Sequence, residues 1–222
     1  MWMVGAFLVI IIGITIFAAV ASNGSSGATG SSGFKATVTA AITSADWTRG
    51  AKNAKVTVIE YGDFQCPACG AYEPLVEQLE KDYATSSVQF VFRNFPLFQI
   101  HPNAMIAAQA AEAAGLQGKY WEMHDLLYAK QNDWVDTANS SVVADKFDGY
   151  VQSLGLNVQK FNTDIQSSAV KDKVQKDLAS GNAASVDHTP TFFINLTQIP
   201  NPNSYDEFKA DIDAALASST QQ

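Results

Sequence analysis

The sequence predicts an α/β fold in which a block of helices is inserted between strands. Three apolar runs typical of buried strands lie at residues 55–61, 88–92 and 191–195. In the long segment between the last two runs, apolar residues recur mostly at helical spacing. The first two runs flank a helical segment, and a strand, a helix and a strand in this order predict a βαβ unit.

The remaining elements are expected around this unit. A short edge strand is predicted at residues 34–43, ahead of the first buried strand. The helix of the unit is predicted at residues 71–83, where Leu75, Val76 and Leu79 share one face. Further helices are predicted at residues 102–130, 142–154, 158–178 and 204–216.

Composition and charge limit the function classes. The chain has 222 residues, of which 47% are hydrophobic and 11% aromatic, enough for one globular domain with a proper core plus an appendage. Its formal net charge is −8, whereas non-specific binding to nucleic acid needs a basic surface. We therefore expect no nucleic-acid partner.

The composition of the N-terminal segment is typical of a membrane-inserted helix. Residues 1–34 contain no charged side chain, and residues 4–21 are almost continuously apolar. As a helix, that run would span roughly 27 Å, close to the hydrocarbon thickness of a bilayer. Residues 1–21 are thus either a transmembrane anchor or a signal peptide cleaved near Ala21, after the small residues that cleavage needs. The length favours the anchor, which predicts an N-terminal transmembrane helix.

A linker follows this segment. Residues 22–33 consist mainly of Gly and Ser, a composition that forms a flexible tether rather than a packed structure. The globular domain is then expected at residues 34–222. Both interpretations of the N-terminus export this domain. We therefore expect a single-pass protein of the cell membrane with its catalytic domain on the extracytoplasmic side, or a secreted or periplasmic domain after cleavage.

The chain has two cysteines, Cys66 and Cys69, which enclose Pro67 and Ala68. The pair lies between the predicted strand at residues 55–61 and the helix that follows. A C-x-x-C at a strand-to-helix junction is typical of a dithiol redox site. A purely structural disulfide is disfavoured, because so small a loop removes little entropy from the unfolded chain.

A zinc site is the other use of such a pair. One C-x-x-C supplies two ligands, whereas a structural zinc site needs four. His101, His124 and His188 are scattered without ligand spacing. A site shared between two chains stays open as an alternative, but we expect no metal.

Several motifs together make the chain resemble the DsbA-like thiol:disulfide oxidoreductases, especially the membrane-anchored bacterial group. The resemblance runs from about residue 46 to about residue 216. It rests on the segments at residues 56–72, 92–97, 101–104, 119–127, 154–157 with Phe161, and 189–195. The fold that it implies is a thioredoxin fold with an inserted helical domain at about residues 98–174.

The resemblance and the position of the motif assign roles to the two cysteines. Cys66 is the nucleophile, exposed at the start of the helix, where the N-terminal amides favour its thiolate. Cys69 is the more buried, resolving thiol. Pro67 and Ala68 tune the pair. The best-known relatives carry His in place of Ala68, so we expect this chain to be less oxidising than they are.

Thr189-Pro190 resembles the cis-proline loop of this family. A cis bond there would expose the preceding backbone for pairing with an extended substrate, and Thr189 would face the sulfurs. An ordinary turn proline is the alternative. His188 stands where relatives commonly have glycine. It is expected either to tune Cys66 or to face solvent as an ordinary loop histidine.

Glu60 is an acid within an apolar strand. In relatives the matching acid assists proton transfer to the buried cysteine, and a buried carboxyl has the raised pKa that suits this task. A carboxylate paired with Arg93 or a nearby lysine is the alternative.

The predicted function is the introduction of disulfides into exported proteins by exchange at Cys66 and Cys69. The expected partners are cysteine-containing exported proteins and, by the resemblance, a membrane quinone-linked reoxidase. No bound cofactor is required, because the cysteines carry the electrons, and we expect a monomer. Two alternatives remain: a disulfide reductase or isomerase, and a non-catalytic substrate-binding module of thioredoxin-like fold.

Overall fold

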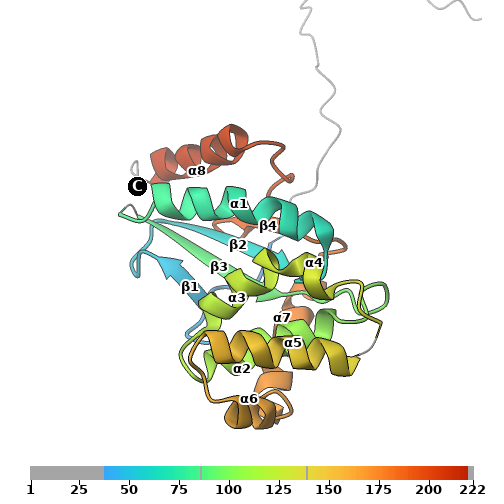
Figure 1. Ribbon diagram of the computed structural model, residues 1–222. Coiled ribbons are helices and arrows are strands. Elements are labelled where there is room, and N and C mark those ends of the chain that lie inside the picture. Colours follow the sequence, from blue (N-terminus) through green and yellow to red (C-terminus); the bar gives the residue numbers. More distant parts are fainter. Residues whose placement is uncertain (1–37, 86, 139, 220–222) are drawn as a thin grey trace, which may run out of the picture. The chain divides into compact units, whose positions relative to one another are not determined.

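The computed structural model describes residues 38–85, 87–138 and 140–219 (Figure 1). The predicted anchor or signal peptide at residues 1–21 and the linker at residues 22–33 lie outside these residues. Within the described part of the chain, none of the helices combines the length and the apolar character that crossing a membrane requires.

A five-stranded mixed sheet forms the centre of the domain. It consists of β1 (Trp47–Gly50), β2 (Val56–Gly62), β3 (Val88–Asn94), β4 (Thr191–Ile194) and β5 (Thr197–Gln198). The spatial order is β1-β3-β2-β4-β5, in which β2 and β3 are parallel and the other neighbours antiparallel. The α/β fold and its βαβ unit are therefore confirmed.

The edge of the sheet differs from the prediction. The strand expected at residues 34–43 is absent from the described part of that range, where Val38 makes only an isolated bridge with Thr197. The edge strand is instead β1, in which Trp47 lies opposite Phe92 of β3. This strand is short and carries Arg49 and a final glycine, so it lacks the apolar alternation by which strands are recognised.

The helices are more finely divided than predicted. Their bounds are α1 (Pro67–Asp82), α2 (Ala104–Gly115), α3 (Tyr120–Ala129), α4 (Gln131–Trp134), α5 (Ser140–Ser153), α6 (Val158–Asp164), α7 (Ser168–Ala183) and α8 (Tyr205–Ser219). The segment predicted as one helix at 102–130 contains a break at Gly118, whose φ of 79° is readily adopted only by glycine. The segment at 158–178 is divided by Ser167, whose side chain accepts a hydrogen bond from the Val170 N–H and caps α7.

Helices cover both faces of the sheet (Figure 1). Val58, Phe90 and Phe192 pack with residues of α1 and α8 on one face. Tyr61 and Phe193 pack on the other face with Leu178 of α7, among other residues. A third cluster of buried residues lies among the inserted helices. It also includes Phe64, Phe92, Cys66 and Cys69, at and near the start of α1.

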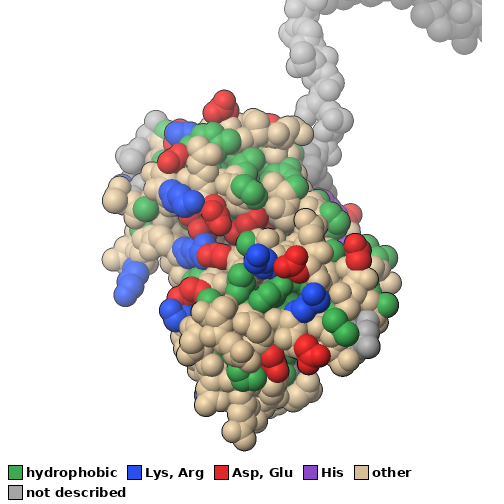
Figure 2. Space-filling model, in the orientation of Figure 1, with side chains coloured by type: hydrophobic (Ala, Val, Ile, Leu, Met, Phe, Trp, Pro, Cys, Tyr) green, Lys and Arg blue, Asp and Glu red, His purple; other side chains and the backbone are tan. Residues whose placement is uncertain are grey.

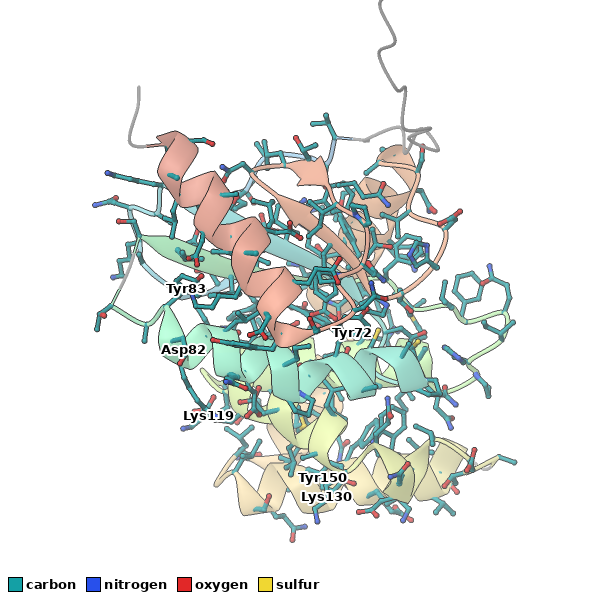
Figure 3. All side chains as sticks on the ribbon, turned by 90° about the horizontal axis from the view of Figure 1, so that it is seen from above. Tyr72, Asp82, Tyr83, Lys119, Lys130 and Tyr150 are labelled. Atoms are coloured by element: carbon teal, nitrogen blue, oxygen red, sulfur yellow. The ribbon has the colours of Figure 1, made fainter. Side chains whose placement is uncertain are left out.

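Two tyrosines fix α1 against the C-terminal segment. The Tyr72 hydroxyl donates to the carbonyl oxygen of Pro202 at 2.8 Å, and the Tyr83 hydroxyl donates to Asp213 Oδ1 of α8 at 2.5 Å. In Figure 3, Tyr83 is labelled at the C-terminal end of α1 and Tyr72 nearer the start of this helix. Helix α1, which begins at the cysteine pair, is therefore held along its length.

Candidate active site

Helix α1 begins earlier than the hydrophobic pattern predicts, and this places the cysteine pair in its first turn. Cys66 is the N-cap residue, with φ −69° and ψ 122°, and Pro67 follows at the first helical position, where its missing N–H leaves no bond unmade. Pro74 lies inside the helix. Cys69 thus sits one turn inside the helix and Cys66 at its positive end.

The two sulfurs differ in burial and contacts. Both cysteines are free thiols; Cys66 is 7% exposed and Cys69 is 1% exposed. The expectation that Cys66 is exposed is therefore wrong, because the loop at Thr189 covers it. Cys66 Sγ donates to the carbonyl oxygen of Thr189 at 3.4 Å, whereas Cys69 Sγ accepts from the Asp63 N–H at 3.5 Å.

The surroundings of Cys66 favour its thiolate. A hydrogen bond from the Cys69 thiol is the largest cause, and together with the Thr189 side chain and the N–H groups of Cys69 and Ala68 it lowers the pKa of Cys66 to about 5 against the opposing effect of burial. The Thr189 hydroxyl has no other partner within the described residues. It is therefore available to donate to the thiolate.

Cys69 has the opposite character. Burial raises the pKa of the Cys69 thiol well above its ordinary value, and the hydrogen bond to Cys66 and the negative charge of Glu60 add to this effect. The pair thus consists of one sulfur that is stable as a thiolate and one that is stable as a thiol.

The loop opposite the cysteines has the predicted cis peptide bond between Thr189 and Pro190. Both residues are buried. The loop is fixed by two hydrogen bonds: Asn201 Nδ2 donates to the Pro190 carbonyl oxygen at 2.7 Å, and Thr191 Oγ1 donates to the His188 carbonyl oxygen at 2.7 Å. Because the Thr189 carbonyl oxygen accepts a hydrogen bond from Cys66 Sγ, Thr189 faces Cys66, as predicted.

The three residues predicted to tune the cysteine pair are all exposed. Pro67 and Ala68 lie beside Cys66 and are exposed, so they form the outer surface of the pair. His188 is also exposed, and its Nδ1 lies 2.7 Å from Asp187 Oδ1 rather than at a sulfur. The structure therefore places His188 as a solvent-facing loop residue.

Glu60 lies in β2 and is 6% exposed. The alternative that pairs it with Arg93 is wrong, because the Arg93 guanidinium binds Asp46 instead, with Nε 2.8 Å from Oδ1. Burial, with the nearby charges of Glu80 and Cys66, raises the pKa of Glu60 to about 8. This carboxyl is therefore mostly protonated at neutral pH and able to give up a proton.

Sequence reasoning missed Asp63, which organises the loop before the pair. Its buried carboxylate accepts hydrogen bonds from the N–H groups of Gln65 and Leu97 at 2.8 and 2.9 Å, and lies 2.7 Å from His101 Nδ1. Its carbonyl oxygen accepts from the Cys66 N–H at 3.0 Å. An acid three residues before the first cysteine, at the end of a strand, was the available signal.

Gln131 was missed as well, although it ties the inserted helices to the active-site loop. Its Nε2 donates to the carbonyl oxygens of Phe64 and Cys66 at 2.8 and 2.9 Å. Gly70 makes room for it, because a Cβ at that position would lie 2.5 Å from Gln131 Oε1. Nothing in the sequence around Gln131 points to this contact, which depends on the packing of α4 against α1.

Within the described residues, one group of three potential metal ligands comes together: Glu73, His124 and Asp125, with ligand atoms within 4.8 Å of one another. Arg49 Nη2 already lies 2.6 Å from both carboxylate oxygens of Asp125. A cation of the protein itself, the Arg49 guanidinium, therefore already pairs with one of the three groups.

A family model described as Thioredoxin matches residues 43–214. The chain belongs to the thioredoxin family. Together with the solved structures below, this match confirms the predicted thioredoxin-like fold and the prediction of a DsbA-like thiol:disulfide oxidoreductase.

Solved structures similar to this thioredoxin-family chain include oxidised BdbD from Bacillus subtilis, with a TM-score of 0.70 and 25% identity over 82% of this chain and 98% of that one. A thioredoxin-like oxidoreductase from Silicibacter pomeroyi gives a TM-score of 0.67 at 23% identity, covering 79% of this chain and 94% of that one. The thiol-disulfide exchange protein α-DsbA2 from Wolbachia pipientis gives 0.63 at 18% identity, covering 75% and 85%. The last two show the fold alone.

Curated relatives include Na(+)/H(+) antiporter NhaA 1 of Salinispora arenicola, 38% identical over 172 residues, and NhaA 3 of Salinispora tropica, 39% identical over 173 residues. Each match covers 78% of this chain and 25% of the relative. The chain thus spans about a quarter of the length of these antiporters.

Proposed function

We propose that this thioredoxin-family oxidoreductase donates disulfides to cysteine-containing exported proteins. The observation that carries the proposal is the asymmetry of the two sulfurs. Cys66, at the start of α1 and beside Thr189, is stable as a thiolate, whereas buried Cys69 is stable as a thiol. A stable thiolate is a good leaving group, and its stability favours the reduced enzyme over the disulfide. Both effects favour transfer of the disulfide to a substrate.

The proposed reaction has two exchange steps. A substrate thiolate attacks Cys66 Sγ, the Cys66–Cys69 bond breaks, and its electron pair leaves on Cys69, which takes up a proton. A second substrate thiolate then attacks the substrate sulfur of the mixed disulfide and displaces Cys66 as a thiolate. The substrate loses two electrons and gains a disulfide, while the enzyme disulfide is reduced to one thiol and one thiolate.

Turnover needs an oxidant, for which we propose a membrane partner that carries its own disulfide and passes electrons to a quinone. The setting proposed for this cycle is the extracytoplasmic side of the cell membrane. The support is the apolar run at residues 4–21, which exports the domain under either interpretation of the N-terminus.

The proposal is tested by mixing the oxidised chain with a reduced, unfolded protein whose native state contains disulfides. We expect substrate disulfides to form as Cys66 and Cys69 become reduced. Cys66→Ser and Cys69→Ser should both abolish the reaction, because neither variant can form the Cys66–Cys69 disulfide. Mixed instead with a substrate that already carries a disulfide, Cys69→Ser should accumulate the mixed disulfide, because no second enzyme sulfur resolves it. If the reduced chain instead cleaves disulfides while the oxidised chain is inert, the direction is that of a reductase. Full activity of Cys66→Ser in cells would favour a binding module.

A further inference from the structure

A groove lies beside the cysteine pair, between the loop from β3 to α2 and the loop from α4 to α5. It encloses about 370 Å³ and is lined by Gln65, Pro67, residues 100–102 and residues 135–138. Gln65 and Pro67 are the chain neighbours of Cys66. The groove therefore starts at the reactive motif and extends from it toward the inserted helices.

The wall formed by the loop from β3 to α2 is apolar and exposed. Ile100 is 69% exposed, more than any other large hydrophobic side chain of the described residues, and Phe98 on the same loop is 48% exposed. Pro67 and Ala138 add exposed apolar surface. In Figure 2, hydrophobic side chains lie along the right-hand edge of the domain, where Figure 1 places these two loops. An apolar patch beside an active site is typical of a surface that contacts a binding partner.

Hydrogen bonds fix the two walls before anything binds. Gln65 Nε2 donates to the Val135 carbonyl oxygen at 2.7 Å, and Gln65 Oε1 accepts from the Asn103 N–H at 2.6 Å. Asn103 Nδ2 donates to the Thr137 carbonyl oxygen at 2.9 Å. Both loops are thus tied to the residue that precedes Cys66, and little conformational freedom is lost when the groove is filled.

The position of the groove selects its occupant. A substrate cysteine that reacts with Cys66 brings its neighbouring residues over the exposed surface of Pro67 and Ala68. Consecutive residues of an extended chain are about 3.3 Å apart, and the Cα atom of Pro67 lies about 3.8 Å from that of Cys66. A side chain one to three positions from the reactive cysteine is therefore within reach of the groove.

Binding of a side chain here adds what the cis-proline loop does not supply. Among the described residues that line the groove, none belongs to the loop at Thr189-Pro190. Pairing of an extended substrate with the backbone at Thr189 depends little on its side chains, whereas pockets for side chains give specificity. Asp136 is exposed and lines the groove, which thus combines apolar walls with a negative charge.

We propose that the groove binds an apolar side chain of the substrate, one to three positions from its reactive cysteine, and so determines which substrate cysteines react fastest. Ile100 and Val135 contact this side chain, and Asp136 favours a basic over an acidic residue next to it. The inference deepens the proposed function and rests on its exchange of disulfides with polypeptides. No bond forms or breaks in the groove itself.

The test uses single-cysteine peptides activated as disulfides with nitrothiobenzoate. The Cys66 thiolate of the reduced chain attacks the peptide sulfur, and the released nitrothiobenzoate is followed by its absorbance. Leu replaces Ala in turn at each position within three residues of the cysteine. We expect one or two of these positions to accelerate the reaction by about tenfold, the effect of burying most of a Leu side chain, and the others to have little effect.

Variants of exposed residues separate the groove from the rest of the surface. Ile100→Ser removes the apolar wall and should reduce the preference for Leu to less than about threefold. Leu116→Ser is the matched control and should retain it, because this side chain is 50% exposed but does not line the groove. Both variants should react with the nitrothiobenzoate disulfide of free cysteine as fast as the unmodified chain, since that reagent has no flanking side chain.

The charge of the groove has its own readout. The unmodified chain should prefer Lys over Glu beside the Leu by about twofold to threefold at low salt, and Asp136→Asn should abolish this preference. Asp136 is exposed, so the variant should fold.

Equal rates for Leu and Ala at every position would overturn the proposal, and so would a uniform increase at all positions, which reflects hydrophobicity alone. An Ile100→Ser variant that keeps the preference for Leu but is reoxidised slowly by membranes would assign the groove to the reoxidising partner instead. These reactions do not depend on the direction of electron flow. A chain that shows the preference but does not oxidise a reduced, unfolded protein would therefore contradict the proposed function alone.

Discussion

At the scale of single residues, the chemistry depends on what each sulfur touches. Cys66 and Cys69 are three residues apart, yet the pKa of one is lowered and that of the other is raised. The cause is position: at the N-cap of α1, Cys66 is stabilised as a thiolate by the Cys69 thiol, the Thr189 hydroxyl and backbone amides, whereas Cys69, one turn inside the helix, is packed into the core. Changes at neighbouring residues should therefore act on the two sulfurs separately.

Replacing Thr189 by Val should weaken the thiolate of Cys66. The hydroxyl lowers the pKa of Cys66, so its loss should reduce alkylation of Cys66 at pH 5–6 by roughly threefold to tenfold, the effect expected for one hydrogen bond to a charged group. Thr189→Ser keeps a hydroxyl and serves as the control. Equal alkylation rates in both variants would show that the hydroxyl has no part in stabilising the thiolate.

Replacing Ala68 by His should make the pair more oxidising. Ala68 contributes its backbone N–H to Cys66 and has no side-chain donor. An added imidazole should lower the pKa of Cys66, and each unit of that decrease should raise the reduction potential by about 30 mV. Titration of the thiolate by ultraviolet absorbance measures the first quantity and equilibration with glutathione the second. An unchanged pKa of Cys66 contradicts the prediction.

Replacing Glu60 by Gln should change the pH dependence of stability. The unfolded carboxyl titrates near its ordinary pKa of 4.5 and the folded one near about 8. Between these values the folded chain holds a proton that the unfolded chain has released, so the free energy of unfolding decreases as pH rises. Relative to the unmodified chain, Glu60→Gln should gain roughly 2–4 kcal/mol between pH 5 and pH 8 in denaturant unfolding. Parallel curves for the two proteins would mean that Glu60 titrates as in water.

At the scale of secondary-structure elements, α4 and the inserted helices hold the active-site loop. Gln131 should be the most sensitive point, because it satisfies the carbonyl oxygens of Phe64 and Cys66. Gln131→Ala should lower the free energy of unfolding by about 1–3 kcal/mol and increase the reactivity of Cys66 with bulky thiol reagents. Exposed Gln152→Ala is the control for helix propensity. Equal midpoints for the two variants in denaturant would contradict the assigned role.

Buried strands and the helix after the cysteine pair were predictable, because apolar residues at period 2 or 3.6 mark them directly. The short elements β1, β5 and α4 were not, because two to four residues carry too little periodicity. At the site, Cys66, Cys69 and Thr189-Pro190 stand out as motifs. Asp63 and Gln131 act through contacts between segments distant in the chain, and those contacts exist only after folding.

The exposure of Cys66 was also beyond sequence reasoning. A residue at a helix N-terminus is often open to solvent, but the loop at Thr189 comes from more than a hundred residues away and covers the sulfur. Glu60 shows the same limit, since the strand pattern left open whether this acid is buried or paired with Arg93, and the fold shows that it is buried and that Arg93 binds Asp46.

At the scale of the whole molecule, the direction of electron flow is a balance between two states of the chain. The reduced state gains from a Cys66 thiolate that is stabilised by the Cys69 thiol, by Thr189 and by the amides at the start of α1. The disulfide state has no such charge to stabilise. The reduced chain should therefore be the more stable of the two, which makes the disulfide a good donor.

The equilibrium reduction potential of the Cys66–Cys69 pair tests this account most directly. It is measured by equilibrating the domain with glutathione buffers and quantifying the reduced fraction. We predict a value well above that of reducing thioredoxins, which lies near about −270 mV, and approaching the range of strong disulfide donors, near about −120 mV. A thioredoxin-like value would contradict the proposed direction and identify the chain as a reductase.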